Sequence, residues 1–114
     1  MELNVLFEET VETTVKAQSS IHMLERDFAD VIGSKKRRVF AEAVYTWQDG
    51  TTSTEAESFV PYKHMDLLQP QIETSVTEKD GTIEIQISAD CFTPFVWLEI
   101  EDDVIFSDNC FDLT

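Results

Sequence analysis

Residues 71–89 read QIETSVTEKDGTIEIQISA and carry the clearest structural signal in the chain. In 82–89 isoleucines alternate strictly with polar residues, and 71–78 alternates in the same way but more loosely. A period of two places apolar side chains on one face of a β-strand and polar side chains on the other. The link contains Asp80-Gly81, a pair that tolerates the positive φ angles of a type I′ turn. The pattern therefore predicts an antiparallel hairpin with one apolar face.

A second hairpin is predicted over residues 38–60, with Asp49-Gly50 as a turn of the same kind. The strand 38–47 carries apolar side chains on both faces, which is typical of a central strand. The strand 51–60 presents threonine, glutamate and serine side chains on one face, which suits a strand at the outside of a sheet.

Weaker strand patterns occupy both ends of the chain. Apolar residues alternate over residues 3–7, and 11–17 is predicted to form another strand. Near the C-terminus, 95–100 and 104–106 are short apolar segments separated by the acidic residues 101–103. We expect these two segments to be strands joined by an acidic turn.

Residues 20–33 fit two descriptions. Apolar residues fall at helical spacing, with Ser20 as a possible N-cap and Gly33 as the left-handed residue after a helix end. The alternative is a strand over 21–25 followed by a single helical turn over 27–32. We favour the strand and short turn because the surrounding segments are all predicted as sheet.

The predicted fold class is all-β, an immunoglobulin- or fibronectin-III-like antiparallel β-sandwich. Several short strands separated by turn signals, with little convincing helix, indicate such an architecture. Pro61 and the segment 67–70 interrupt the strand rhythm, and the residue before a proline is driven to extended geometry. We place a junction between two modules near residues 62–69.

Composition limits the classes of partner. The chain has 114 residues and a formal net charge of −15, so binding to nucleic acid or to an anionic membrane surface is not expected. The basic residues 35–38 (KKRR) could be a nucleic-acid patch, but a solvated loop that offsets acidic neighbours is the favoured interpretation. Leucine, isoleucine, valine and phenylalanine number 33, which predicts a chain able to bury a core.

Cysteine usage and the start of the chain indicate a compartment. The two cysteines, Cys91 and Cys110, are too few for the framework of a disulfide-rich secreted domain, so buried free thiols are favoured over a disulfide. No apolar segment approaches the roughly 20 residues that span a bilayer, and no signal peptide is expected. We therefore expect a cytoplasmic location, with export as part of a longer protein as the alternative.

No catalytic, cofactor or metal site is predicted. Twenty-three acidic residues guarantee that some carboxylates lie close together, but a glycosidase needs two held at a fixed separation across a cleft. The two histidines, His22 and His64, have no partner at ligand spacing. Asp108, Asn109 and Asp112 could in principle bind calcium, although side-chain caps of a turn are the favoured interpretation.

Two aromatic residues are candidates for contact with a sugar, namely Trp47 and Tyr62. Trp47 ends a hairpin strand, where its indole could be exposed for stacking. Trp97 lies between two apolar residues in a predicted strand, so we expect it in the core. Buried aromatic residues dominate the cores of β-sandwiches, which favours packing over ligand contact for the whole set.

The C-terminal residues carry the most specific resemblance to a known family. They read FVWLEI at 95–100 and VIFSDNCFDL at 104–113. This is similar to the C-terminal immunoglobulin-like domain of β-mannosidases in the second glycoside hydrolase family, where a V-x-L strand precedes F-S-D-N-Y-F-D-L. Cys110 stands where the family has tyrosine. Three other segments are similar to parts of the same region: FVPYKHMDL at 59–67, MLERDFADVI at 23–32 and WQDG at 47–50.

The resemblance implies a non-catalytic accessory region rather than an enzyme. The catalytic glutamates of that family lie in a (β/α)₈ barrel, and a barrel of about 250 residues does not fit in this chain. The implied modules are 1–66, the later strands of one sandwich, and 67–114, the early strands of a C-terminal immunoglobulin-like module; one closed sandwich over 1–114 is the alternative. The implied role is structural support of the barrel, which would be the main partner. A homodimer formed by strand pairing, a carbohydrate-binding module and an immunoglobulin-like interaction domain remain alternatives.

Overall fold

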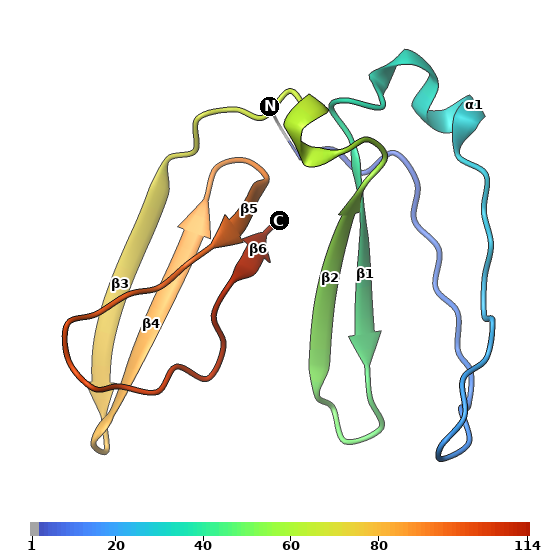
Figure 1. Ribbon diagram of the computed structural model, residues 1–114. Helices are drawn as coiled ribbons and strands as arrows, with labels where there is room; N and C mark the ends of the chain where they lie inside the picture. Colours follow the sequence, from blue (N-terminus) through green and yellow to red (C-terminus); the bar gives the residue numbers. More distant parts are fainter. Residues whose placement is uncertain (1–2) are drawn as a thin grey trace.

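The computed structural model describes residues 3–114 and shows an almost entirely β-stranded chain (Figure 1). Its six strands pair antiparallel in three two-stranded sheets, β1–β2, β3–β4 and β5–β6, which confirms the all-β class. None of the helices in residues 3–114 has the length and hydrophobicity needed to cross a bilayer. In chain order the elements are α1 (Ala29–Ile32), the 3₁₀ turn η1 (Gly33–Lys35), β1 (Phe40–Thr46), β2 (Thr52–Ser58), the 3₁₀ turn η2 (Tyr62–His64), β3 (Ile72–Lys79), β4 (Thr82–Ala89), β5 (Thr93–Val96) and β6 (Phe111–Leu113).

The β3–β4 hairpin forms as its alternation predicts. Asp80 and Gly81 both have positive φ angles, 53° and 76°, as a type I′ turn requires. The register pairs Val76 with Ile85, so residues directly opposite each other share a face. One face of this hairpin is therefore apolar and carries Ile72, Val76, Ile83, Ile85 and Ile87, while the other carries only polar and charged side chains.

The β1–β2 hairpin also forms, but its turn is of a different kind from the one predicted. Trp47 pairs with Thr51, so the loop has three residues rather than two, and only Gly50 has a positive φ, 85°. The amide of Gly50 donates to the carbonyl of Trp47 at 3.0 Å, which closes a tight turn ahead of the glycine. This is the three-residue hairpin loop in which one left-handed residue follows the turn. The loop length, not the Asp-Gly pair, determines the turn type.

Asp49 couples the β1–β2 turn to pH. Its Oδ1 accepts hydrogen bonds from the Thr51 hydroxyl at 2.5 Å and the Thr51 amide at 2.9 Å, and these bonds hold the pKa of Asp49 below its ordinary value. The order they give the turn is fully present above the ordinary pKa of an aspartate and is lost as pH falls through the lowered pKa. An NMR titration should show the Thr51 amide shift moving with this lowered pKa. It should be flat in Asp49→Asn, and a wild-type midpoint at the ordinary value would contradict the assignment.

The N-terminal segment does not contain the strands predicted at 3–7, 11–17 and 21–25. The chain instead reverses at Gln18, whose φ is 56°, and returns beside itself as two extended legs (Figure 1). The amide of Ser19 donates to the carbonyl of Lys16 at 3.2 Å across this reversal. Residues 3–28 have no strand assigned, so alternation here specifies an extended chain without a hydrogen-bonded partner.

Side chains nevertheless hold the two legs in a constant register. The rings of Phe7 and Phe28 meet edge to face at 5.2 Å between centroids, and Arg26 pairs with Glu9 at 2.7 Å. Moving two residues along one leg, from Phe7 to Glu9, moves the partner two residues back along the other, from Phe28 to Arg26. The pair Lys16 and Ser19 at the turn fits the same register. Partners that run in opposite directions along the two legs are typical of antiparallel strands. This segment therefore has the register of a hairpin but lacks the ladder of backbone hydrogen bonds.

The single helical turn predicted over 27–32 is confirmed as α1, and a longer helix starting at Ser20 is absent from the described residues. The Oδ1 of Asp27 accepts the Ala29 amide at 2.8 Å and so satisfies a donor at the start of the turn. Gly33 follows with a φ of 54° and ends it.

The predicted strand pair 95–100 and 104–106 is wrong. β5 pairs instead with β6, through Thr93 opposite Leu113 and Val96 opposite Phe111, and residues 97–110 form the connection. Asn109 holds this connection, because its side-chain amide accepts the Leu98 amide at 2.7 Å and donates to the Leu98 carbonyl at 2.8 Å. One side chain thus substitutes for a strand partner at that position.

The expectation that the chain buries its own core is also wrong. Among the described residues only Cys91 and Phe92 are buried. The accessible surface is 10101 Å², against about 6,400 Å² for a compact protein of this mass. The radius of gyration is 17.2 Å, against about 13 Å. Trp97, expected in the core, is 66% exposed. The three two-stranded sheets are therefore formed, but their apolar side chains are largely uncovered.

The buried residues among those described, Cys91 and Phe92, lie where the β1–β2 hairpin meets the segment that leads into β5. Phe92 stacks on Phe40 with ring centroids 4.1 Å apart and planes within 16° of parallel. Asp66 forms ion pairs with Arg37 at 2.8 Å and Arg38 at 3.3 Å, and its amide donates to the carbonyl of Arg37 at 2.8 Å. The Asp66 contacts hold the segment after β2 against the segment before β1, and the aromatic stack holds the start of β1 against the residue before β5.

Candidate functional site

The two candidate sugar-contact residues lie at opposite ends of the β1–β2 hairpin. Trp47 follows β1 beside the turn, whereas Tyr62 begins η2 beyond the other end of β2. The seven residues of β2 separate them, a length of roughly 23 Å. Trp47 is 61% exposed. The structure therefore does not bring the two rings together into one stacking platform.

Tyr62 is half-buried and has packing partners. Its ring meets Phe95 edge to face at 4.8 Å between centroids, and its hydroxyl donates to the Ala56 carbonyl at 3.5 Å. Burial raises the pKa of the Tyr62 hydroxyl, and the charges of Asp112 and Glu57 raise it further. These surroundings place Tyr62 in the contact between the β1–β2 hairpin and the C-terminal strands.

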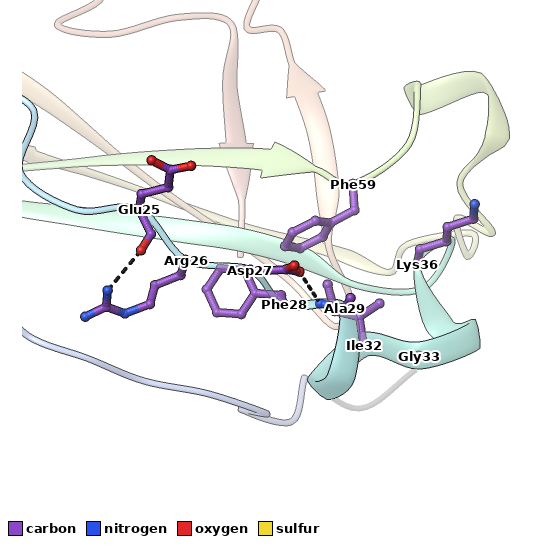
Figure 2. Close-up of a pocket in the computed structure, with 9 residues that line it drawn as sticks. All are labelled: Glu25, Arg26, Asp27, Phe28, Ala29, Ile32, Gly33, Lys36 and Phe59. Atoms are coloured by element: carbon purple, nitrogen blue, oxygen red, sulfur yellow. Dashed lines mark hydrogen bonds between the residues drawn. The ribbon is translucent and has the colours of Figure 1, made fainter.

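A first hollow lies near α1, as Figure 2 shows. The rings of Phe28 and Phe59 meet there edge to face at 5.9 Å between centroids. Its arginine, Arg26, is already engaged by both carboxylate oxygens of Glu9, and this pairing lowers the pKa of Glu9. The side chains of Arg26 and Asp27 are thus already engaged within the protein itself. The hollow is lined by Glu25, Arg26, Asp27, Phe28, Ala29, Ile32, Gly33, Lys36 and Phe59.

A second hollow, called here the β2–β6 groove, lies between the β1–β2 hairpin and the C-terminal strands. Five consecutive residues of β2 form one wall, and Phe95 of β5, residues of β6 and residues beside β6 form the other. Three of its side chains are carboxylates, and none is basic. The groove is lined by Thr52, Ser53, Thr54, Glu55, Ala56, Phe95, Asp108, Cys110, Phe111, Asp112 and Thr114.

The oxygen-rich residues considered for calcium serve as acceptors for backbone amides. Asp108 accepts the Asn109 amide at 2.8 Å, and Asp112 accepts the Phe95 amide at 2.8 Å. Asn109 is occupied by Leu98, as described above. Within residues 3–114 no group of three or more potential metal-ligating side chains is found. The geometry agrees with side-chain capping, the interpretation favoured from the sequence.

The basic residues 35–38 and the two cysteines were also considered from the sequence. Arg37 and Arg38 both pair with Asp66, which agrees with a loop whose charge offsets acidic neighbours. Both cysteines are free thiols. Cys91 is buried as predicted, but Cys110 is exposed, because it occupies a turn with a φ of 59° immediately before β6.

The β2–β6 groove was not predicted from the sequence. The hydroxyl-rich pattern of residues 51–60 marks β2 as an outer strand, and that signal was available. The opposite wall depends on the pairing of β5 with β6 across a long connection, which no local pattern specifies.

Comparisons with known families match almost the whole chain. Residues 1–64 match a family model described as a mannosidase Ig/CBM-like domain. Residues 67–114 match a family model of mannosidases described as an Ig-fold domain. Comparison with curated proteins and with solved structures returned no match. The two family matches confirm the resemblance to the immunoglobulin-like region of mannosidases and, with the antiparallel sheets, the immunoglobulin-like fold class.

Proposed function

Because the chain belongs to the mannosidase Ig/CBM-like domain family through residues 1–64, we propose that it is the C-terminal accessory region of a β-mannosidase-like glycoside hydrolase. The regions matched are non-catalytic immunoglobulin-like domains of mannosidases. The parent enzyme would hydrolyse terminal β-mannosides in a separate barrel domain. In this proposal residues 1–66 and 67–114 are parts of two successive modules, and their role is to support the barrel.

The large uncovered surface is the observation that carries a supporting role. The chain exposes about 3,700 Å² more than a compact protein of its mass. A standard protein interface buries only about 800 Å² on each partner. Isoleucine and valine side chains on the apolar face of β3–β4 contribute to this excess. The apolar face of a sheet is normally buried against another element. A large partner such as the catalytic barrel would cover this surface in the same way.

A second copy of the chain is the weaker candidate for that cover. Each copy carries a formal net charge of −15, so pairing two copies brings together surfaces of the same sign. The unpaired edges of the three two-stranded sheets favour some form of strand pairing. Strand pairing with a partner of lower negative charge avoids this repulsion.

Trp47 supports a second candidate function, that of a carbohydrate-binding module. Its indole is 61% exposed at the end of the β1–β2 hairpin, where a sugar ring could stack on it. Tyr62 would not share that site, because it lies beyond the other end of β2 and packs on Phe95. Of the two candidate residues, a binding module would therefore depend on Trp47.

Two assays on the 114-residue chain test the proposal. A chromogenic β-mannoside should give no turnover, and calorimetric titration with mannobiose and longer manno-oligosaccharides should give no saturable binding. Turnover would overturn the accessory assignment. Saturable binding lost in Trp47→Ala but kept in Trp97→Ala, a matched change at an indole of similar exposure, would favour the carbohydrate-binding function instead.

A further inference from the structure

The outer edge of β2 presents backbone groups that β1 does not use. The amide of Trp47 donates to the carbonyl of Thr51, so this is a hydrogen-bonded pair of the ladder. Hydrogen-bonded and non-bonded pairs alternate along an antiparallel ladder. Thr52, Thr54 and Ala56 therefore belong to non-bonded pairs, and their N–H and C=O groups point away from β1.

The position of Tyr62 agrees with this assignment. Its hydroxyl reaches the Ala56 carbonyl at 3.5 Å from outside the hairpin. That carbonyl is therefore directed outward, as the alternation requires. Tyr62 also closes the edge at Ala56, so the open part of the edge is limited to Thr52 and Thr54.

The β2–β6 groove runs along this open edge. It is lined by every residue from Thr52 to Ala56 in succession. Successive side chains in a strand point to opposite faces, so a hollow that touches all five lies against the edge of β2 rather than against one face. The outward backbone groups of Thr52 and Thr54 consequently face the groove, where an extended chain could pair with them.

The chemistry of the groove indicates the kind of strand it fits. Glu55, Asp108 and Asp112 supply negative charge, and no lysine, arginine or histidine lines the groove. Phe95 and Phe111 supply apolar surface on the side of the C-terminal strands. Basic side chains complement the carboxylates, and apolar side chains complement the aromatic rings.

We propose that the β2–β6 groove binds an extended peptide strand with alternating basic and apolar side chains, which adds to the edge of β2 at Thr52 and Thr54. The backbone bonds supply the affinity, and the carboxylates of the groove select a basic strand. A second copy of this acidic chain is a poor donor of such a strand. The proposal goes beyond the supporting role and does not depend on the sugar that the parent enzyme hydrolyses.

A labelled octapeptide of alternating lysine and valine, added to the 114-residue chain, tests the proposal by fluorescence anisotropy. We expect saturable binding that protects the Thr52 and Thr54 amides from hydrogen exchange. N-methylation of the peptide nitrogens that face β2 should weaken binding by about tenfold or more, because each lost hydrogen bond is worth roughly a factor of five. A peptide with glutamate in place of lysine should not bind.

A pair of charge variants on β2 provides the matched control. Glu55→Gln removes a carboxylate from the groove, whereas Glu57→Gln removes one from the same strand outside it. We expect about a two- to fivefold loss of affinity for the first and none for the second. Equal losses in the two variants, unchanged binding of the N-methylated peptide, protection away from Thr52 and Thr54, or no binding would each overturn the proposal.

Discussion

Phe92→Ala should abolish the cooperative unfolding transition of the 114-residue chain. Phe92 is one of two buried residues among those described, and its ring stacks on Phe40 at 4.1 Å. Truncating a buried phenylalanine to alanine typically costs about 3–5 kcal/mol. A chain whose hairpins share so little buried surface has few other contacts to offset that loss, since an isolated two-stranded hairpin is marginally stable at best. Urea unfolding followed by circular dichroism measures the effect.

An exposed isoleucine provides the control for this variant. Ile105 is fully exposed, so Ile105→Ala removes a comparable apolar side chain without opening a cavity. Its free energy of unfolding should stay within about 0.5 kcal/mol of the wild type. If Phe92→Ala still unfolded cooperatively with a loss as small as that of Ile105→Ala, the contact between Phe92 and Phe40 would not hold the hairpins together.

The parts of the fold that could be predicted are those determined by local sequence. In β3–β4 the alternation of residues 82–89 specifies the faces, and Asp80-Gly81 specifies the turn, so both strands and their register follow. The β1–β2 hairpin was predicted for the same reason. Its turn type was not, because the loop has one residue more than the Asp-Gly pair suggests.

The parts that could not be predicted depend on contacts between distant residues. Alternation at 3–7 and 11–17 looks like strand, but a strand needs a ladder of backbone hydrogen bonds. The two legs of residues 3–28 meet through the Phe7–Phe28 and Glu9–Arg26 side chains and share a backbone bond at the turn, between Ser19 and Lys16. β5 finds its partner at Phe111–Leu113, across a long connection that no short-range pattern encodes. Closing such a loop costs conformational entropy, and the contacts that offset this cost form only between residues far apart in the sequence. A local sequence pattern does not reveal these contacts.

Exposure was the least predictable property, and the candidate sites depend on it. An apolar composition indicates that these residues can contribute to a core. It does not show whether the side chains that complete this core belong to the same chain. Trp97 lies between apolar neighbours and is nevertheless 66% exposed. The β2–β6 groove was missed for a related reason, because one of its walls is built by the β5–β6 pairing.

If the proposed supporting role is correct, cover by the proposed parent enzyme should have its largest effect on the apolar face of β3–β4. Ile83 lies on that face and is 59% exposed in the chain by itself. Ile83→Lys should therefore change the free energy of unfolding of the 114-residue chain by no more than about 0.5 kcal/mol. In the full-length parent enzyme the same lysine would be buried without a partner, at a cost of at least about 2 kcal/mol. Gln86→Lys adds the same charge on the polar face of β4 and is the matched control.

The most direct measurement compares these two lysine variants by urea unfolding, in the 114-residue chain and in the full-length parent enzyme. If the hairpins complete their core against the rest of that enzyme, Ile83→Lys is tolerated in the chain and strongly destabilises the parent, while Gln86→Lys is tolerated in both. If Ile83→Lys were tolerated equally in the chain and in the parent, the apolar face of β3–β4 would be solvent-exposed in the whole protein, and the supporting role proposed here would be contradicted.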